Sequence, residues 1–118
     1  MAASSMVVSQ FQGVTVVSFR GASIVDAMVV QAIGEQLSDI IDQQAAKRLI
    51  LDFDVVRMMS SQMLGVLISL QKKAKEIKGR VVLCAVRPEV MKIFDIMKLT
   101  KMFEFAPSEA EGFRKLGF

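Results

Sequence analysis

Two adjacent serines, Ser60 and Ser61, are the residues of this chain best placed to do chemistry. They follow a hydrophobic run that ends in acid, LILDFD, and they precede a stretch with apolar residues at helical spacing. A serine at a helix start can cap the helix, which stabilises it by about 1 kcal/mol relative to alanine. It can also carry a phosphate, because free N–H groups and the positive end of the helix dipole favour a dianion there. Both roles fit the residues.

The composition argues against the commoner kinds of catalytic site. The chain has no histidine, which removes Ser-His and Cys-His pairs, histidine phosphotransfer and most zinc or iron sites. Its one cysteine, Cys84, lies in the apolar run RVVLCAV, and we interpret it as a small buried side chain. The GK[ST] element of a P-loop does not occur. We therefore expect a protein that is not an enzyme and that uses no cofactor.

Three aspartates, Asp26, Asp52 and Asp54, fall near the expected end of the sheet and could hold a cation such as Mg²⁺. Ordinary structural roles account for them equally well. Asp26 precedes a helical pattern and can cap it, and Asp52 can accept a hydrogen bond from a backbone amide. The three residues lack the fixed spacing of a metal-binding motif, so we expect no metal site.

The chain of 118 residues is 53% hydrophobic, which is the size and composition of one folded domain. We expect that single domain to cover residues 1–118, with residues 1–5 disordered. The opening residues MAASSMVV lack the basic region and apolar run of a signal peptide, and no apolar stretch approaches the ~18 residues of a membrane span. The expectation is a soluble, cytoplasmic protein without a membrane partner.

Nucleic-acid binding is not expected from the charge or the aromatic residues. The net charge is only +3, and the chain has neither tryptophan nor tyrosine to stack on bases. A group of lysines between Lys72 and Lys78 falls late in a helical segment, where cations favour the negative end of the helix dipole.

The periodicity of the apolar residues predicts the elements that position the serines. Gln12-Gly13 separates two β-rich runs and predicts a hairpin, and Gly79 is expected at the C-cap of the helix that begins at the serines. Strands are expected at 6–11, 14–19, 49–53, 81–86 and 102–105, and helices are expected to begin near Asp26, Ser60, Pro88 and Pro107. The order is β-β-α-β-α-β-α-β-α. It predicts a single-domain α/β fold with a mixed, mostly parallel sheet of about five strands and about four helices.

Methionines surround the serines and suggest an adaptable apolar surface for a protein partner. Met58 and Met59 lie on the loop before the helix. Met63 and Val66 fall off the Leu64/Leu67/Leu70 stripe and are expected to point outward or sideways, and Met91 is expected off the inner face of the next helix. The same residues could instead fill gaps beneath the loop.

The order of these motifs resembles the STAS domain family, of the anti-sigma-factor antagonist type. In that family an apolar strand ends in aspartate, and a D-S-[ST]-G-L-G helix start follows. A long helix ending in glycine, another strand and a P-E-V helix come next. Here LILDFD, SSQMLG, VVLCAV and RPEV occupy those places, and GASIVDAMVV resembles the family's G-x-L-D segment before its first helix. The resemblance covers nearly the whole chain.

The resemblance implies that Ser61 is the phosphorylated serine, since Leu64-Gly65 aligns with the family's L-G. Ser60 then stands where the family has aspartate and is the fallback acceptor. Gln62 and Met63 replace a hydroxyl residue and a glycine. The implied partner surface comprises Asp26, Asp54, Met58, Met59, Ser60, Gln62, Met63, Val66 and Met91.

The resemblance also implies the partners and the mechanism. A GHKL-type serine kinase, which is also the anti-sigma factor, would phosphorylate the serine, and a PP2C-type phosphatase would remove the phosphate. The unphosphorylated domain would bind the kinase and free a sigma factor. The alternative is an unphosphorylated STAS-type scaffold that self-associates, or binds a nucleotide or lipid, through the methionines and the hairpin edge.

Overall fold

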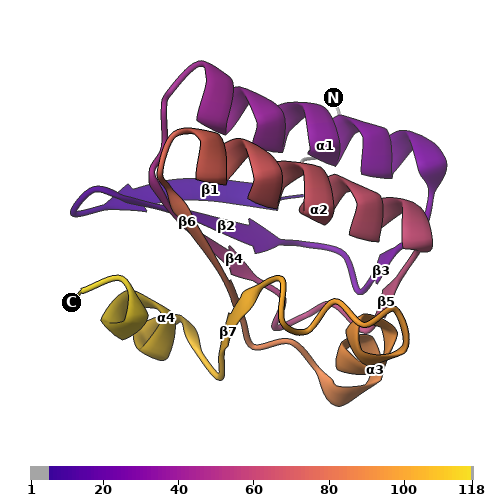
Figure 1. Ribbon diagram of the computed structural model, residues 1–118. Coiled ribbons are helices and arrows are strands. Elements are labelled where there is room, and N and C mark those ends of the chain that lie inside the picture. Colours follow the sequence, from indigo (N-terminus) through magenta and orange to yellow (C-terminus); the bar gives the residue numbers. More distant parts are fainter. Residues whose placement is uncertain (1–5, 118) are drawn as a thin grey trace.

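The computed structural model describes residues 6–117 and shows a twisted sheet with helices on both faces (Figure 1). The strand order is β1-β2-β4-β6-β7, in which β1 is antiparallel to β2 and the other neighbours are parallel. The strands are β1 (Met6–Phe11), β2 (Val14–Phe19), β4 (Arg48–Asp52), β6 (Arg80–Cys84) and β7 (Glu104–Ala106). The predicted mixed, mostly parallel five-stranded sheet is confirmed. The expected disorder of residues 1–5 falls outside the described residues.

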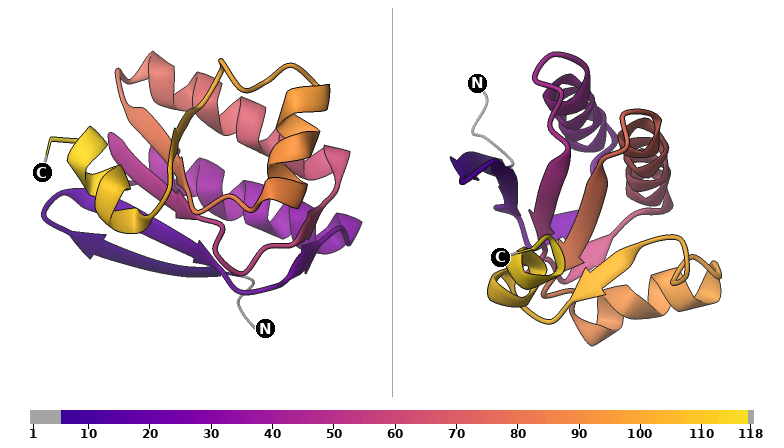
Figure 2. Two further views of the ribbon diagram at one scale, coloured as in Figure 1. Left: turned by 90° about the horizontal axis from the view of Figure 1, so that it is seen from below. Right: turned by 60° about the vertical axis from the view of Figure 1, so that its left-hand side comes forward.

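Four helices are described, in the predicted order: α1 (Ala27–Asp42), α2 (Ser61–Glu76), α3 (Pro88–Ile96) and α4 (Glu109–Lys115). Figure 2 shows α1 and α2 side by side on one face of the sheet, α4 on the other face, and α3 beyond the end of β6. Gly34 of α1 allows this close packing, because a Cβ there would lie 3.2 Å from Val66 of α2. Within residues 6–117, no helix has both the length and the apolar character needed to span a bilayer.

Alternation along the strands builds a core on each face of the sheet. In β4, Leu49 and Leu51 join the larger cluster beneath α1 and α2, while Ile50 joins the smaller cluster beneath α4. The α3 residues Val90 and Phe94 close the larger cluster at the carboxyl end of the sheet. This two-sided burial explains why the run LIL is continuously apolar rather than alternating.

A second, two-stranded parallel sheet joins β3 (Ser23–Ile24) to β5 (Met58–Met59). The periodicity did not predict it, because two residues are too few to show a repeat. It ties the segment before α1 to the segment before α2, and it therefore sets where both helices begin.

Gly79 was expected at the C-cap of α2, and this prediction is wrong. The helix is capped at Ile77, and Lys78 adopts the left-handed conformation with φ 59°. Gly79 then donates its N–H to the Ala74 carbonyl at 2.7 Å, which completes a Schellman motif. Glycine is needed there for a different reason, since a Cβ would lie 3.0 Å from the Lys47 carbonyl oxygen.

Candidate functional site

The two serines take different roles at the start of α2. Ser60 is the N-cap, in an extended conformation, and its hydroxyl oxygen accepts a hydrogen bond from the Met63 N–H at 3.3 Å. Ser61 is the first helical residue and is exposed. By helix geometry, the N–H groups of Ser61 and Gln62 lack an intrahelical acceptor. An anion on the Ser61 hydroxyl would therefore meet backbone donors and the positive end of a 16-residue helix.

The small β3–β5 sheet holds these serines in place. Ser60 donates its N–H to the Ile24 carbonyl at 3.0 Å, and Met59 pairs with Ile24 in the sheet register. Gln62 extends across to α1, where its side-chain amide lies 3.5 Å from the Ala27 carbonyl oxygen. The first turns of α1 and α2 thus lie together at one end of the molecule.

Exposed apolar side chains gather on the segments that meet at this end. Met28, in the first turn of α1, is 82% exposed, and Val25 lies just before that helix. Val55 and Met58 belong to the connection between β4 and α2 and are also exposed. We call Val25, Met28, Val55 and Met58 the Ser61 patch. Met28 could have been found in the sequence, because it falls off the Val30/Ile33/Leu37 stripe.

The predicted partner-binding residues do not all reach the surface. Met58 is exposed, and Val66 and Met91 are partly buried. The expectation that Met63 points outward is wrong, because its exposed fraction is 0%, and Met59 is also buried. Met63 lies four residues before Leu67, so it belongs to a wider apolar stripe than the one that begins at Leu64.

The aspartates have the structural roles that their positions suggested. Asp26 caps α1 by accepting hydrogen bonds from the N–H groups of Met28 and Val29, at 2.9 and 3.2 Å. Asp52 accepts from the Asp54 N–H at 2.8 Å. The exposed Asp54 offers its own carbonyl oxygen to the Arg87 guanidinium at 2.8 Å, which links the β4–β5 loop to the start of α3.

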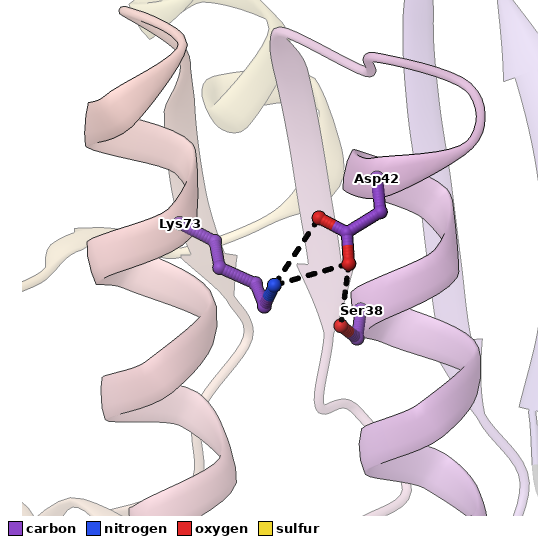
Figure 3. A network of polar contacts seen from close by, with 3 residues as sticks. All are labelled: Ser38, Asp42 and Lys73. Atoms are coloured by element: carbon purple, nitrogen blue, oxygen red, sulfur yellow. Dashed lines mark hydrogen bonds and ion pairs between the residues drawn. The ribbon is translucent and has the colours of Figure 1, made fainter.

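A groove of about 400 Å³ runs between α1 and α2 from Gln62 to Lys73. Figure 3 shows its far end, where the Lys73 ammonium lies 3.0 and 3.1 Å from the two Asp42 carboxylate oxygens, and the Ser38 hydroxyl donates to the same carboxylate. The hydrogen bond from Lys73 lowers the pKa of Asp42. The bridge joins the last turn of α1 to α2 at this end of the groove.

A second group of titratable side chains lies beneath α4, on the opposite face of the sheet. Glu109, the first residue of α4, shares a hydrogen bond with Asp52; together with burial and the Asp52 charge, this raises the pKa of Glu109 to about 7. Burial, followed by the charges of Asp52 and Glu109, raises the pKa of Cys84 to about 12. Cys84 is fully buried and is a thiol at neutral pH, as its apolar surroundings in the sequence predicted.

Comparisons with known proteins agree with this architecture. The family model of the STAS domain matches residues 5–112. The chain is similar to the structure of an anti-sigma-factor antagonist (STAS) domain protein from Planctomyces limnophilus, with 21% identity, a TM-score of 0.86 and coverage of 98% of this chain and 100% of that chain.

Two structures of the anti-sigma factor antagonist SpoIIAA are also similar. The unphosphorylated form has 23% identity, a TM-score of 0.81 and coverage of 96% of this chain and 97% of that chain. The phosphorylated form, from Bacillus, has 22% identity, a TM-score of 0.72 and coverage of 92% of this chain and 97% of that chain. These structural likenesses show the shared fold, and the family model spans nearly all of the sequence. The protein belongs to the STAS domain family.

Proposed function

We propose that this STAS domain is an anti-sigma-factor antagonist, a non-enzymatic binding module. Its binding to an anti-sigma kinase is switched by phosphate on Ser61. One observation carries the proposal: Ser61 is exposed at the first position of α2, and the segments that lead into α1 and α2 carry the exposed apolar side chains of the Ser61 patch. A phosphate at that point changes the charge of a surface that is otherwise suited to docking.

Ser61 is favoured over Ser60 as the acceptor. The Ser60 hydroxyl is partly buried and occupied in capping the Met63 N–H, so its modification would remove that cap. Ser61 is exposed, and its modification would leave the Ser60 cap in place. Similar structures exist for SpoIIAA in an unphosphorylated and a phosphorylated form, so the fold accommodates a phosphate in that protein.

The proposed cycle has two steps. A GHKL-type kinase, which is also the anti-sigma factor, transfers the γ-phosphoryl group of ATP to the Ser61 oxygen and releases ADP and the hydroxyl proton. A PP2C-type phosphatase later hydrolyses the phosphoserine to serine and inorganic phosphate. The phosphate adds nearly two negative charges, and their desolvation at an apolar interface would weaken binding to the kinase.

The test separates the two serines. The wild-type chain, Ser61→Ala and Ser60→Ala are incubated with a GHKL-type anti-sigma kinase and ATP, and the modified residue is mapped by mass spectrometry. We expect Ser61→Ala to lose the phosphate and Ser60→Ala to keep it. Phosphate mapped to Ser60 in the wild-type chain, or retained by Ser61→Ala, would contradict the assignment.

Binding to the same kinase supplies the second readout. Calorimetry should give weaker binding for Ser61→Asp than for the wild-type chain, and unchanged binding for Ser61→Ala. If the phosphorylated wild-type chain binds the kinase as tightly as the unphosphorylated chain does, the proposed charge switch is excluded, even with Ser61 as the acceptor.

An unphosphorylated scaffold is the second candidate. It is favoured by Ser60, which stands where the resemblance to the STAS family implies an aspartate and whose hydroxyl caps α2 instead of supplying a carboxylate. For a scaffold, partner binding is the same before and after treatment with kinase and ATP, and Ser61→Asp leaves it unchanged.

A further inference from the structure

The two edges of the main sheet differ in how well they are protected against pairing with a strand from another molecule. At one edge, β7 has three residues, Glu104 forms an ion pair with Arg80 at 2.5 Å, and Pro107 follows directly. These are devices by which proteins prevent a sheet edge from recruiting another strand. At the other edge, β1 has six residues, MVVSQF, with no charge and no proline. Figure 2 shows β1 at the margin of the molecule.

The outer side of β1 is regular as well as unprotected. Every residue from Met6 to Phe11 has a partner in β2, so the strand carries no bulge that would twist its edge away. Within residues 6–117, β2 is the strand that pairs with β1, and the order of the sheet ends there. The backbone groups that point away from β2 are therefore a template for one more strand.

The side chains of β1 expose apolar surface on both faces. Val7, Ser9 and Phe11 lie on the α4 face of the sheet. There the Phe11 and Phe113 rings pack edge-on, with their centroids 5.6 Å apart. Val7 and Phe11 are 43% and 56% exposed. On the opposite face Met6 enters the larger core, and Val8 is exposed. β1 is therefore an edge strand with apolar side chains on both faces, and part of this apolar surface stays exposed to solvent in the monomer.

We propose that β1 pairs in antiparallel fashion with β1 of a second copy, about a twofold axis through Ser9, to join two sheets into one. This register places Val7 opposite Phe11 twice on the α4 face and Val8 opposite Gln10 twice on the other face, so apolar and aromatic side chains meet across the axis. β1 contains no charged side chain, so this pairing brings no like charges together along the strand, although each copy has a net charge of +3. The strand is thus complementary to itself.

The hairpin geometry fixes which atoms meet. Gln12 and Gly13 both have positive φ, as in a two-residue type I′ turn, so Phe11 and Val14 close it as a hydrogen-bonded pair. Ser9 then directs its backbone groups toward β2, while Val8 and Gln10 direct theirs outward. A Ser9–Ser9 contact would be a non-hydrogen-bonded pair with Cα atoms about 4.5 Å apart, which is within the range of a disulfide.

The expected association is weak. One strand pair buries less area than the roughly 1,200 Å² at which standard protein interfaces begin. The dimer should therefore form at high concentration and dissociate on dilution. It does not depend on phosphate at Ser61, and Ser61→Ala should dimerise as the wild-type chain does.

Ser9→Cys tests the register directly. The native chain has one cysteine, and that residue is buried, so the added thiol is the accessible one. Under mild oxidation with oxidised glutathione, Ser9→Cys should form a disulfide-linked dimer much faster than Gln36→Cys, a matched exposed site on α1. Equal rates for the two variants, or no linked dimer with Ser9→Cys, would overturn the proposed pairing.

Analytical ultracentrifugation from low micromolar to near-millimolar concentration tests the association itself. We expect the wild-type chain and Gln36→Lys to shift toward a dimer, and Ser9→Lys to dimerise at least roughly tenfold more weakly, because it sets two ammonium groups opposite each other. Circular dichroism melts verify that each variant is folded. A wild-type chain that stays monomeric throughout the range, or a dimer that Ser9→Lys does not weaken, would refute the proposal.

Discussion

Replacing Glu109 with glutamine should remove a pH dependence from the stability of the fold. The hydrogen bond with Asp52, burial and the Asp52 charge raise the pKa of Glu109 from 4.5 to about 7 in the folded protein. A group whose pKa is higher when folded stabilises the fold fully below its unfolded value and loses that contribution as pH rises through its folded value. The free energy of unfolding should therefore fall between pH 4.5 and pH 7.

The size of the effect follows from the shift and from the exposure of the site. One pKa unit corresponds to about 1.4 kcal/mol, which would give roughly 3 kcal/mol for an unscreened pair. Glu109 is only partly buried, and solvent screening reduces the expected loss to about 1 kcal/mol. The chain has no histidine, so no imidazole titrates in this range to obscure the slope.

Urea unfolding at intervals from pH 5 to pH 8 measures this slope. The wild-type chain should lose about 1 kcal/mol across the range, whereas Glu109→Gln should be nearly flat, because its amide can donate to Asp52 without a titrating proton. Glu111→Gln is the matched control, since Glu111 lies in the same turn and pairs with Arg114 instead. A slope that persists in Glu109→Gln, or a flat wild-type profile, would refute the assignment of the raised pKa to Glu109.

Further variants test three local features of the fold by equilibrium unfolding. Gly112→Ala should destabilise by about 1–3 kcal/mol, because its Cβ would lie 2.5 Å from the buried Cys84 sulfur, and Cys84→Ala should recover part of that loss. Lys78→Gly should stabilise by about 0.5–1 kcal/mol, since Lys78 occupies the left-handed conformation with φ 59°. Ser60→Ala should cost about 1 kcal/mol through the lost cap, whereas Ser61→Ala should be within about 0.5 kcal/mol of wild type; equal costs would contradict the division of roles.

Long apolar repeats made the main elements predictable. The hairpin bounds matched at both strands because Gln12-Gly13 is a strong turn signal between two β-rich runs. The strands predicted at 49–53 and 81–86 lie at 48–52 and 80–84, and such shifts of one or two residues are expected where a continuous apolar run has no alternation to mark its ends. Asp26 and Ser108 cap α1 and α4, which fits the preference of short polar side chains for that position.

The features that were missed depend on contacts between distant segments. The β3–β5 sheet has two residues per strand, and its pairing of Ile24 with Met59 leaves no repeat in either segment. Met63 was assigned to the surface by its offset from Leu64, but Met63 and the loop residue Val56 both belong to the larger buried cluster, which is wider than the Leu64 stripe. The Glu109–Asp52 pair joins residues 57 positions apart, and spacing along the chain gives no sign of it.

The division between Ser60 and Ser61 explains how one helix start can serve both the fold and a switch. The hydroxyl that stabilises α2 belongs to Ser60, which is partly buried and held to β3 through its N–H. The neighbouring Ser61 is exposed, so a phosphate there would leave the cap intact and gain the favourable electrostatics of the helix terminus. The added charge would therefore change the surface around the Ser61 patch without removing the cap of α2. The proposed phosphate at Ser61 would thus change binding to a partner while the fold that presents the serine stays the same.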